Sequence, residues 1–198
     1  MKYAILWSLV LLSLHVNAAI LLDEGHAKNS TIHSKTAEDS FALRKLRRAG
    51  IGVSAAGALG LAGISLELNL TPENSFKAGY GGGPGYQSYN IEMKRTMGSG
   101  AFLPYMGGGF AHWYTSGSKH ESITTTTPNF LAEKFMTEDE KRQGIINENI
   151  LYPSIGLQFI QLGEPMAGSS IYMELMVLVE VGQMQAVPTG SFGYTYYF

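Results

Sequence analysis

The chain has 198 residues, of which 45% are apolar, 11% aromatic and only 15% charged. Globular domains carry about 25% charged residues, so this chain is short of charge. The near balance of 14 basic and 16 acidic residues gives no basic footprint for nucleic acid. The absence of cysteine excludes disulfides, thiolate metal sites and a cysteine nucleophile. The length predicts one domain, alone or with an appendage.

The N-terminus has the pattern of a secretory signal peptide. Lys2 is followed by an apolar run over residues 3–14 and then by small or modest side chains up to Ala18. This pattern predicts a signal peptide over residues 1–18, cleaved after Ala18 or Ala19. The apolar run is shorter than the roughly 20 residues that a membrane-spanning helix needs. We expect the mature chain to have no membrane-spanning helix.

Residues 19–49 are polar and are predicted to form a periplasmic N-terminal extension that is partly helical. Its helix is expected over residues 36–49, with Thr36 as the N-cap, Asp39 at the third position and Gly50 as the stop. Four cations crowd the last turn: Arg44, Lys45, Arg47 and Arg48. Two interpretations stay open for them, namely contact with anionic phospholipid and a solvated helix end beside a domain.

From Gly50 onward the hydrophobic pattern changes to a period of two. Residues 64–70, 171–181 and 192–198 alternate without a fault, which places one set of side chains on each face of a strand. Between turn signals, eight strands are predicted near residues 51–58, 61–70, 75–82, 86–96, 101–115, 148–162, 169–181 and 189–198. Because most joins are short, the sequence predicts an all-β fold, an eight-stranded antiparallel up-and-down barrel over residues 50–198.

Two arrangements of the barrel faces have to be distinguished. If the polar positions face water, the chain is a soluble secreted ligand-binding barrel, and if they face the lumen, the apolar positions meet lipid. The signal peptide and the lack of a membrane-spanning helix favour the lipid-facing arrangement. An exported chain without such a helix can span a membrane only as a closed barrel. Aromatic residues are also expected near the strand ends, as interface girdles require: Tyr86, Trp113, Tyr114, Tyr152, Tyr194, Tyr196 and Phe198.

The C-terminal strand carries the most specific pattern of the chain. Aromatic side chains alternate up to the last residue: Phe192, Tyr194, Tyr196 and Phe198. This ending resembles the C-terminal signature by which the outer-membrane assembly machinery recognises Gram-negative barrels. With the signal peptide, the eight short strands and the glycine-rich hairpins, residues 50–198 resemble the small OmpA-like or opacity-type outer-membrane β-barrel superfamily.

This resemblance implies a location in the bacterial outer membrane after signal-peptide cleavage. Its implied partners are outer-membrane lipid and the barrel assembly machinery, and we expect a monomer. Residues 19–49 are not a standard part of such barrels, and we expect no peptidoglycan-binding domain of the kind that follows some of them. Both departures limit the resemblance to the barrel itself.

The even number of strands predicts on which side of the membrane each connection lies. With both termini periplasmic, the joins after the second, fourth and sixth strands are short periplasmic turns. The long connection, residues 116–147, follows the fifth strand and is expected on the cell surface as the third extracellular loop. A helix is expected within it over residues 129–143. The loop is interpreted either as the contact site for a surface partner or as a solvated cap.

The polar positions of the strands predict a network inside the barrel: Glu67, Lys77, Glu92, Lys94, His112, Glu174 and Glu180. Side chains just fill an eight-stranded barrel, and an unpaired charge there costs several kcal/mol. We therefore expect ion pairs that fill the lumen and a structural or surface-interaction role. The alternative is a narrow, low-conductance channel for ions or small solutes.

Some eight-stranded barrels are lipid A-modifying enzymes, which remains a further alternative here. His112 is followed by Trp113 and Tyr114, not by a serine suited to a hydrolase pairing, and His120 lies in the long loop. The remaining histidines lack ligand partners at metal spacing. We therefore expect no enzyme, no catalytic residue, no cofactor and no metal site.

Overall fold

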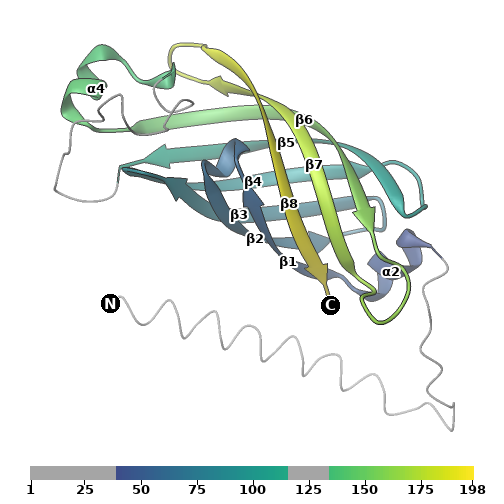
Figure 1. Cartoon of the computed structure of the whole chain (residues 1–198). Coiled ribbons are helices and arrows are strands. Elements are labelled where there is room, and N and C mark those ends of the chain that lie inside the picture. The colour runs from purple at the N-terminus through teal and green to yellow at the C-terminus, as the bar shows by residue number, and fades with distance from the viewer. Residues whose placement is uncertain (1–38, 116–133) are drawn as a thin grey trace, which may run out of the picture. The chain divides into compact units, whose positions relative to one another are not determined.

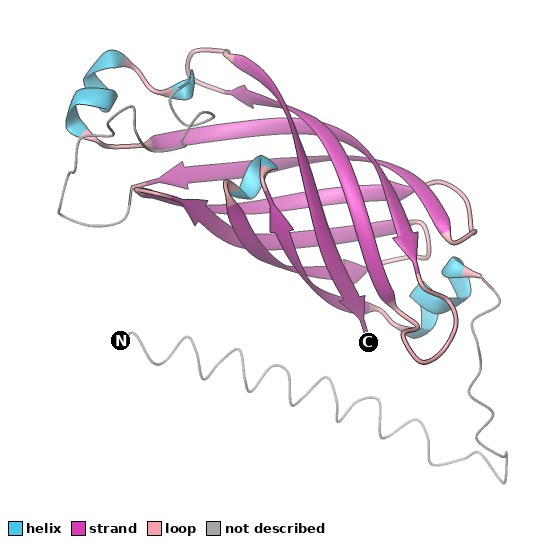
Figure 2. Ribbon diagram, viewed as in Figure 1, coloured by secondary structure: helices cyan, strands magenta, loops and turns pink. Residues whose placement is uncertain are grey.

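The computed structural model describes residues 39–115 and 134–198. Within these residues, eight antiparallel strands form a closed barrel in which each strand pairs with its neighbours in sequence and β8 pairs with β1 (Figures 1 and 2). The strands are β1 (Ala49–Ala55), β2 (Ala62–Asn69), β3 (Asn74–Gly83), β4 (Tyr86–Thr96), β5 (Phe102–Tyr114), β6 (Asn147–Ile160), β7 (Ser169–Glu180) and β8 (Ala186–Tyr197). The predicted all-β, eight-stranded antiparallel barrel is therefore confirmed.

Short helical elements lie at the two ends of the barrel. Helix α2 (Ser40–Leu46) precedes β1 and lies at the end where β8 finishes, whereas α4 (Glu138–Gln143) lies at the opposite end (Figure 1). The 3-10 turn η2 (Gly57–Leu59) is in the join between β1 and β2. We call the two ends the α2 end and the α4 end.

Alternation along each strand decides which side chains enter the barrel. In β7 the odd-numbered residues from Ile171 to Val177 are exposed, and the even-numbered residues from Tyr172 to Glu180 are buried. Glycine is needed where a ring crosses a neighbouring strand. A Cβ atom at Gly156 would overlap the ring of Tyr105, so its absence lets that ring lie across β6.

Buried apolar side chains gather near both ends of the interior. One cluster includes Trp113, Phe135 and Leu178, and the other includes Leu43, Leu103 and Tyr197. The first includes residues of the long β5–β6 connection, and the second includes a residue of α2. Both ends of the barrel are thus filled by side chains from outside the sheet as well as from within it.

The element boundaries differ from prediction where local turns intervene. β1 ends at Ala55 and not near residue 58, because Ala56 and Gly57 have φ angles of 63° and 81° and turn the chain into η2. Helix α2 begins at Ser40, with the Asp39 carboxylate accepting a bond of 2.7 Å from the amide of Ala42. Gly50 lies inside β1 and does not stop the helix.

The helix predicted over residues 129–143 is not continuous in the described residues. Helix α4 begins at Glu138, and Thr137 is its N-cap in a reciprocal capping box with Glu140. Residues 1–38 and 116–133 lie outside the described residues, and so do the predicted signal peptide, Thr36 and most of the predicted surface loop. No described helix is long and apolar enough to cross a membrane.

All the described residues belong to one compact unit. This unit contains both α2 and the barrel. The sequence division at residues 49 and 50 therefore separates two elements that pack against each other.

Candidate functional site

The part of the barrel interior next to the α2 end holds a first group of charged side chains, on β2, β4 and α2. The Lys94 ammonium lies 2.7 Å from one Glu67 carboxylate oxygen, and the Arg44 guanidinium lies 3.4 Å from the same oxygen. Lys94 also lies 5.0 Å from the centroid of the Tyr105 ring. One buried carboxylate thus holds two buried cations, an arrangement that keeps all three charges paired.

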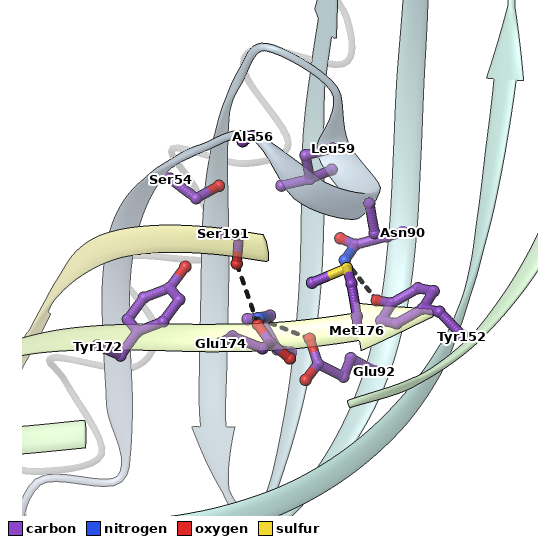
Figure 3. Close-up of a pocket in the computed structure, with 12 residues that line it drawn as sticks. Ser54, Ala56, Leu59, Asn90, Glu92, Tyr152, Tyr172, Glu174, Met176 and Ser191 are labelled. Carbon is purple, nitrogen blue, oxygen red and sulfur yellow. Dashed lines mark hydrogen bonds and ion pairs between the residues drawn. The ribbon is translucent and has the colours of Figure 1, made fainter. Parts of the chain in front are cut away.

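A second charged group lies beside the first, on β3, β4 and β7. The Lys77 ammonium lies 2.6 Å from Glu92 and 3.9 Å from Glu174, and its nitrogen is 5.3 Å from the centroid of the Tyr172 ring. The Ser191 hydroxyl donates a bond of 3.2 Å to Glu174 (Figure 3). The β3–β4 register places Lys77 directly opposite Glu92, so this pair follows from strand pairing.

Together the two groups contain equal numbers of opposite charges. Arg44, Lys77 and Lys94 supply three positive charges, and three negative charges come from Glu67, Glu92 and Glu174. The first group alone has one cation in excess, and the second has one carboxylate in excess. Since each unpaired buried charge would cost several kcal/mol, the proximity of the two groups favours both, because their six charges balance.

Only a small space remains within this network. A cavity of about 10 Å³ lies between the second charged group and the turn that carries Leu59 (Figure 3). Three side-chain oxygens that line it have no hydrogen-bond partner, namely Asn90 Oδ1, Glu92 Oε1 and Glu174 Oε1. A cavity of this size has room for about one water molecule. The cavity beside the second charged group therefore offers no room for a solute larger than water.

At the α2 end, arginine side chains close the barrel. Arg44 is fully buried, and its guanidinium donates to Asn69 and to the carbonyl of Pro72 at 3.0 Å each, and to Thr96. Arg47 donates to the carbonyl of Ala167 and, at 3.2 Å, to that of Tyr197. Neither expectation for the cation cluster of residues 44–48 holds for Arg44, because the carboxylate of Glu67 draws it into the interior.

At the α4 end, apolar packing closes the barrel. The indole of Trp113 donates a bond of 2.7 Å to the carbonyl of Ala58, and the Ser88 hydroxyl donates one of 2.7 Å to that of Leu59. These bonds hold η2 inside the barrel wall. The ring of Phe135 meets Trp113 edge to face, with 5.9 Å between the centroids. The joins after β1 and β5 thus both contribute to the filling of this end.

The structure places five of the seven residues of the predicted network together: Glu67, Lys77, Glu92, Lys94 and Glu174. Glu180 also points inward, but its carboxylate accepts bonds from the amides of Gly182 and Gln183 in the β7–β8 turn. His112 lies on the outer face, 3.0 Å from Asn149, and does not join the network. The reason is alternation, because its neighbour Trp113 takes the inward position.

The predicted aromatic girdle needs a correction. Tyr86, Trp113 and Tyr152 are buried inside the barrel and cannot face its surroundings. On the outer face, aromatic side chains form one band near each end of the barrel, and each band includes residues that were not predicted. The band at the α4 end comprises Tyr80, Tyr89, His112 and Tyr114. The band at the α2 end comprises Phe102, Phe159, Tyr194, Tyr196 and Phe198. In β8 and at the C-terminus, Phe192, Tyr194, Tyr196 and Phe198 all point outward.

Sequence reasoning missed Arg44 as a member of the interior network. A signal for it was present, since the predicted network held four glutamates and only two lysines. That shortage of positive charge indicates a further buried cation. The helix before β1 supplies the nearest cluster of candidates along the chain.

Within the described ranges, no group of three histidine, cysteine, aspartate or glutamate side chains is arranged to hold a metal ion. Comparison with known proteins gives no family for this chain, since neither a protein-family model nor a curated protein matches its sequence. The site is therefore defined by its own geometry, a charge-balanced network in a barrel filled at both ends.

Proposed function

We propose that this protein is a bacterial outer-membrane β-barrel with a structural or surface-interaction role. The observation that carries the proposal is the apolar outer face between the two aromatic bands. Fourteen exposed aliphatic and methionine side chains make up this apolar belt: Ile51, Val53, Ile64, Leu66, Leu68, Ile91, Met93, Met106, Leu151, Ile155, Leu157, Met173, Leu175 and Val177. A soluble barrel would place such a set inside, whereas lipid takes it on the outside.

The inverted distribution of polar groups supports the same proposal. Among the described strand residues, Arg95 is the only outward-facing side chain that is charged at neutral pH, and it lies near the α2 end. All other charges of the strands are turned inward, where most of them are paired. If the outer face were in contact with water, charged side chains would be favoured outside and apolar side chains inside.

The filled interior favours a structural role over a channel. The charged groups fill the lumen from the α2 end to its middle, and the cavity beside the second group is only about 10 Å³. Side chains from η2 and α2 occupy its ends. Conduction of a solute would require several of these buried contacts to break together. No observation specifically favours a lipid A-modifying activity.

The proposed topology places the α2 end in the periplasm and the α4 end at the cell surface. Both the start of β1 and the end of β8 lie at the α2 end, as the parity of a barrel with periplasmic termini requires. The β5–β6 connection then emerges at the cell surface, where it offers a contact site for a partner. The outward aromatic residues of β8 are the proposed signal for the assembly machinery.

The experiment that tests the proposal follows three proteins, the parent chain, Val177→Arg and Met184→Arg, in a Gram-negative host. Each is located by membrane fractionation and run on a gel with and without boiling in mild detergent. We expect the parent and Met184→Arg in the outer membrane with a heat-dependent change in mobility. Val177→Arg places a charge in the apolar belt, costs about 2–4 kcal/mol near the bilayer midplane and reduces the folded fraction.

Met184 is the matched control because it is exposed but lies in the β7–β8 turn, outside the belt. Recovery of the parent protein from the soluble periplasm, or equal tolerance of arginine at both positions, would contradict the proposal.

A further inference from the structure

We propose that the α2 end binds the headgroups of anionic phospholipid through a basic rim formed by Lys45, Leu46, Arg48 and Leu70. This inference rests on the proposed function, because it needs the apolar belt to lie in a bilayer. Membrane insertion alone requires neither a particular lipid class nor a particular binding place on the barrel, and the proposal specifies both.

The first argument is the division of labour among the four cations of residues 44–48. Arg44 and Arg47 are bound by protein groups inside the barrel mouth and at the β6–β7 turn. Lys45 and Arg48 are exposed, and no carboxylate of the described chain lies within 4.0 Å of either. These two positive charges are therefore available to a ligand.

The second argument is an exposed leucine between the two cations. Leu43 and Arg44 form the inward side of α2, which turns Leu46 outward, where 71% of its surface is exposed. Leu70, which directly follows β2, is also exposed. Large apolar side chains beside exposed cations suit the boundary between acyl chains and headgroups better than they suit bulk water.

The third argument is that the basic rim is continuous with the apolar belt. The amide of Asn69 donates a bond of 2.7 Å to the carbonyl of Arg48, so Arg48 lies beside the end of β2. Leu68 of the belt follows directly on the outer face of that strand. A cation in this position can reach the phosphate of a lipid whose acyl chains cover the belt.

The two ends differ in charge, which points to an anionic headgroup specifically at the α2 end. Helix α4 has the sequence EDEKRQ, with three acidic and two basic residues, whereas residues 44–48 near the end of α2 include four cations and no acidic residue. Each cation at an anionic membrane surface strengthens association by about fivefold at moderate salt. We therefore expect a preference of at least fivefold for anionic over zwitterionic lipid at the basic rim.

The test uses tryptophan as a local reporter in Leu46→Trp, with Met184→Trp as the matched control. The two parent side chains are similarly exposed, at 71% and 73%, but lie at opposite ends, and Met184 is flanked by glutamines. Each protein is reconstituted in phosphatidylcholine vesicles that contain phosphatidylglycerol, with brominated chains on one lipid or the other. The emission of the parent protein is subtracted.

We expect brominated phosphatidylglycerol to quench the fluorescence of Leu46→Trp at least fivefold more strongly than brominated phosphatidylcholine does. This difference should disappear in 0.5 M salt, and also when Lys45→Gln and Arg48→Gln are added to Leu46→Trp. Met184→Trp should show no preference for either lipid. Equal quenching of Leu46→Trp by both lipids, in protein that keeps its heat-dependent mobility, would overturn the basic rim alone. A protein that neither inserts nor is quenched by any lipid would instead overturn the proposed function.

Discussion

The two ends of this barrel are closed by different physical means. At the α2 end, Arg44 inserts as a charged side chain whose partners are Glu67, Asn69 and Thr96. At the α4 end, Trp113 and Phe135 pack as rings, and a single indole bond to Ala58 orients them. The α2 end adds directional bonds of a charged side chain to its apolar cluster, whereas the α4 end depends mainly on shape and apolar area.

This difference has an energetic consequence. A buried ion pair contributes little net stability compared with an apolar replacement, but removal of one partner leaves a charge that has no solvent. Apolar packing loses free energy in proportion to the atoms removed and to the cavity that remains. We therefore expect the α2 end to be sensitive to the identity of single residues and the α4 end to be sensitive to volume.

The largest effect is expected for Glu67→Ala, which removes the shared partner of Arg44 and Lys94. Because two buried cations lose their carboxylate, the free energy of unfolding should fall by about 5 kcal/mol, the upper end of the range for a broken buried pair. Urea unfolding in detergent micelles measures the change.

The matched control is Glu73→Ala, whose carboxylate lies 3.6 Å from Arg95 in an exposed pair. That change should cost only about 0–1 kcal/mol. A loss for Glu67→Ala as small as that of the control would mean that the charges at the α2 end are hydrated.

The next largest effect is expected for Trp113→Ala at the α4 end. Loss of a fully buried indole should cost about 3–5 kcal/mol and release η2, because the bond to the Ala58 carbonyl is lost as well. The same unfolding experiment gives the free energy, and proteolysis near η2 reports its release.

Tyr114→Ala is the control for this prediction, because the neighbouring side chain points outward and leaves the interior intact. If Trp113→Ala and Tyr114→Ala were equally stable in micelles, the prediction that apolar packing closes the α4 end would be contradicted.

The smallest effect compares the helix caps at the two ends. Asp39→Ala removes the N-cap of α2, and Thr137→Ala removes that of α4, at a cost of about 1 kcal/mol each. Trypsin should then cleave after Arg47 faster in Asp39→Ala than in the parent chain, since α2 holds Arg44 and Arg47 in place. No acceleration of this cleavage would show that the arginines hold α2 without the cap.

Much of the fold was predictable because the hydrophobic period is local. The strict alternation over residues 171–181 predicts which side chains of β7 face inward, and the structure confirms it for Glu174 and Glu180. The turn after β1 was less predictable. Ala56 adopts a positive φ, a conformation that is rare for alanine and has no signal in the sequence.

The sequence predicted that the candidate site consists of paired charges, but it did not predict every residue that belongs to the site. Strand pairing brings Lys77 opposite both Glu67 and Glu92, so these partners follow once the hairpins are known. Arg44 and His112 were misplaced for different reasons. Arg44 enters the interior from a helix outside the sheet, and His112 leaves it because a one-residue difference in register exchanges the two faces.

The sequence by itself determined that this chain forms eight antiparallel strands with polar side chains on one face and apolar side chains on the other. It could do so because an alternating pattern expresses the geometry of a single strand, whatever its neighbours are. Only the tertiary structure decided that Glu67 pairs with Arg44 and Lys94, that Glu174 approaches Lys77, and that η2 fills the α4 end. These contacts join segments distant in sequence, so they exist only after β8 pairs with β1 and the barrel closes.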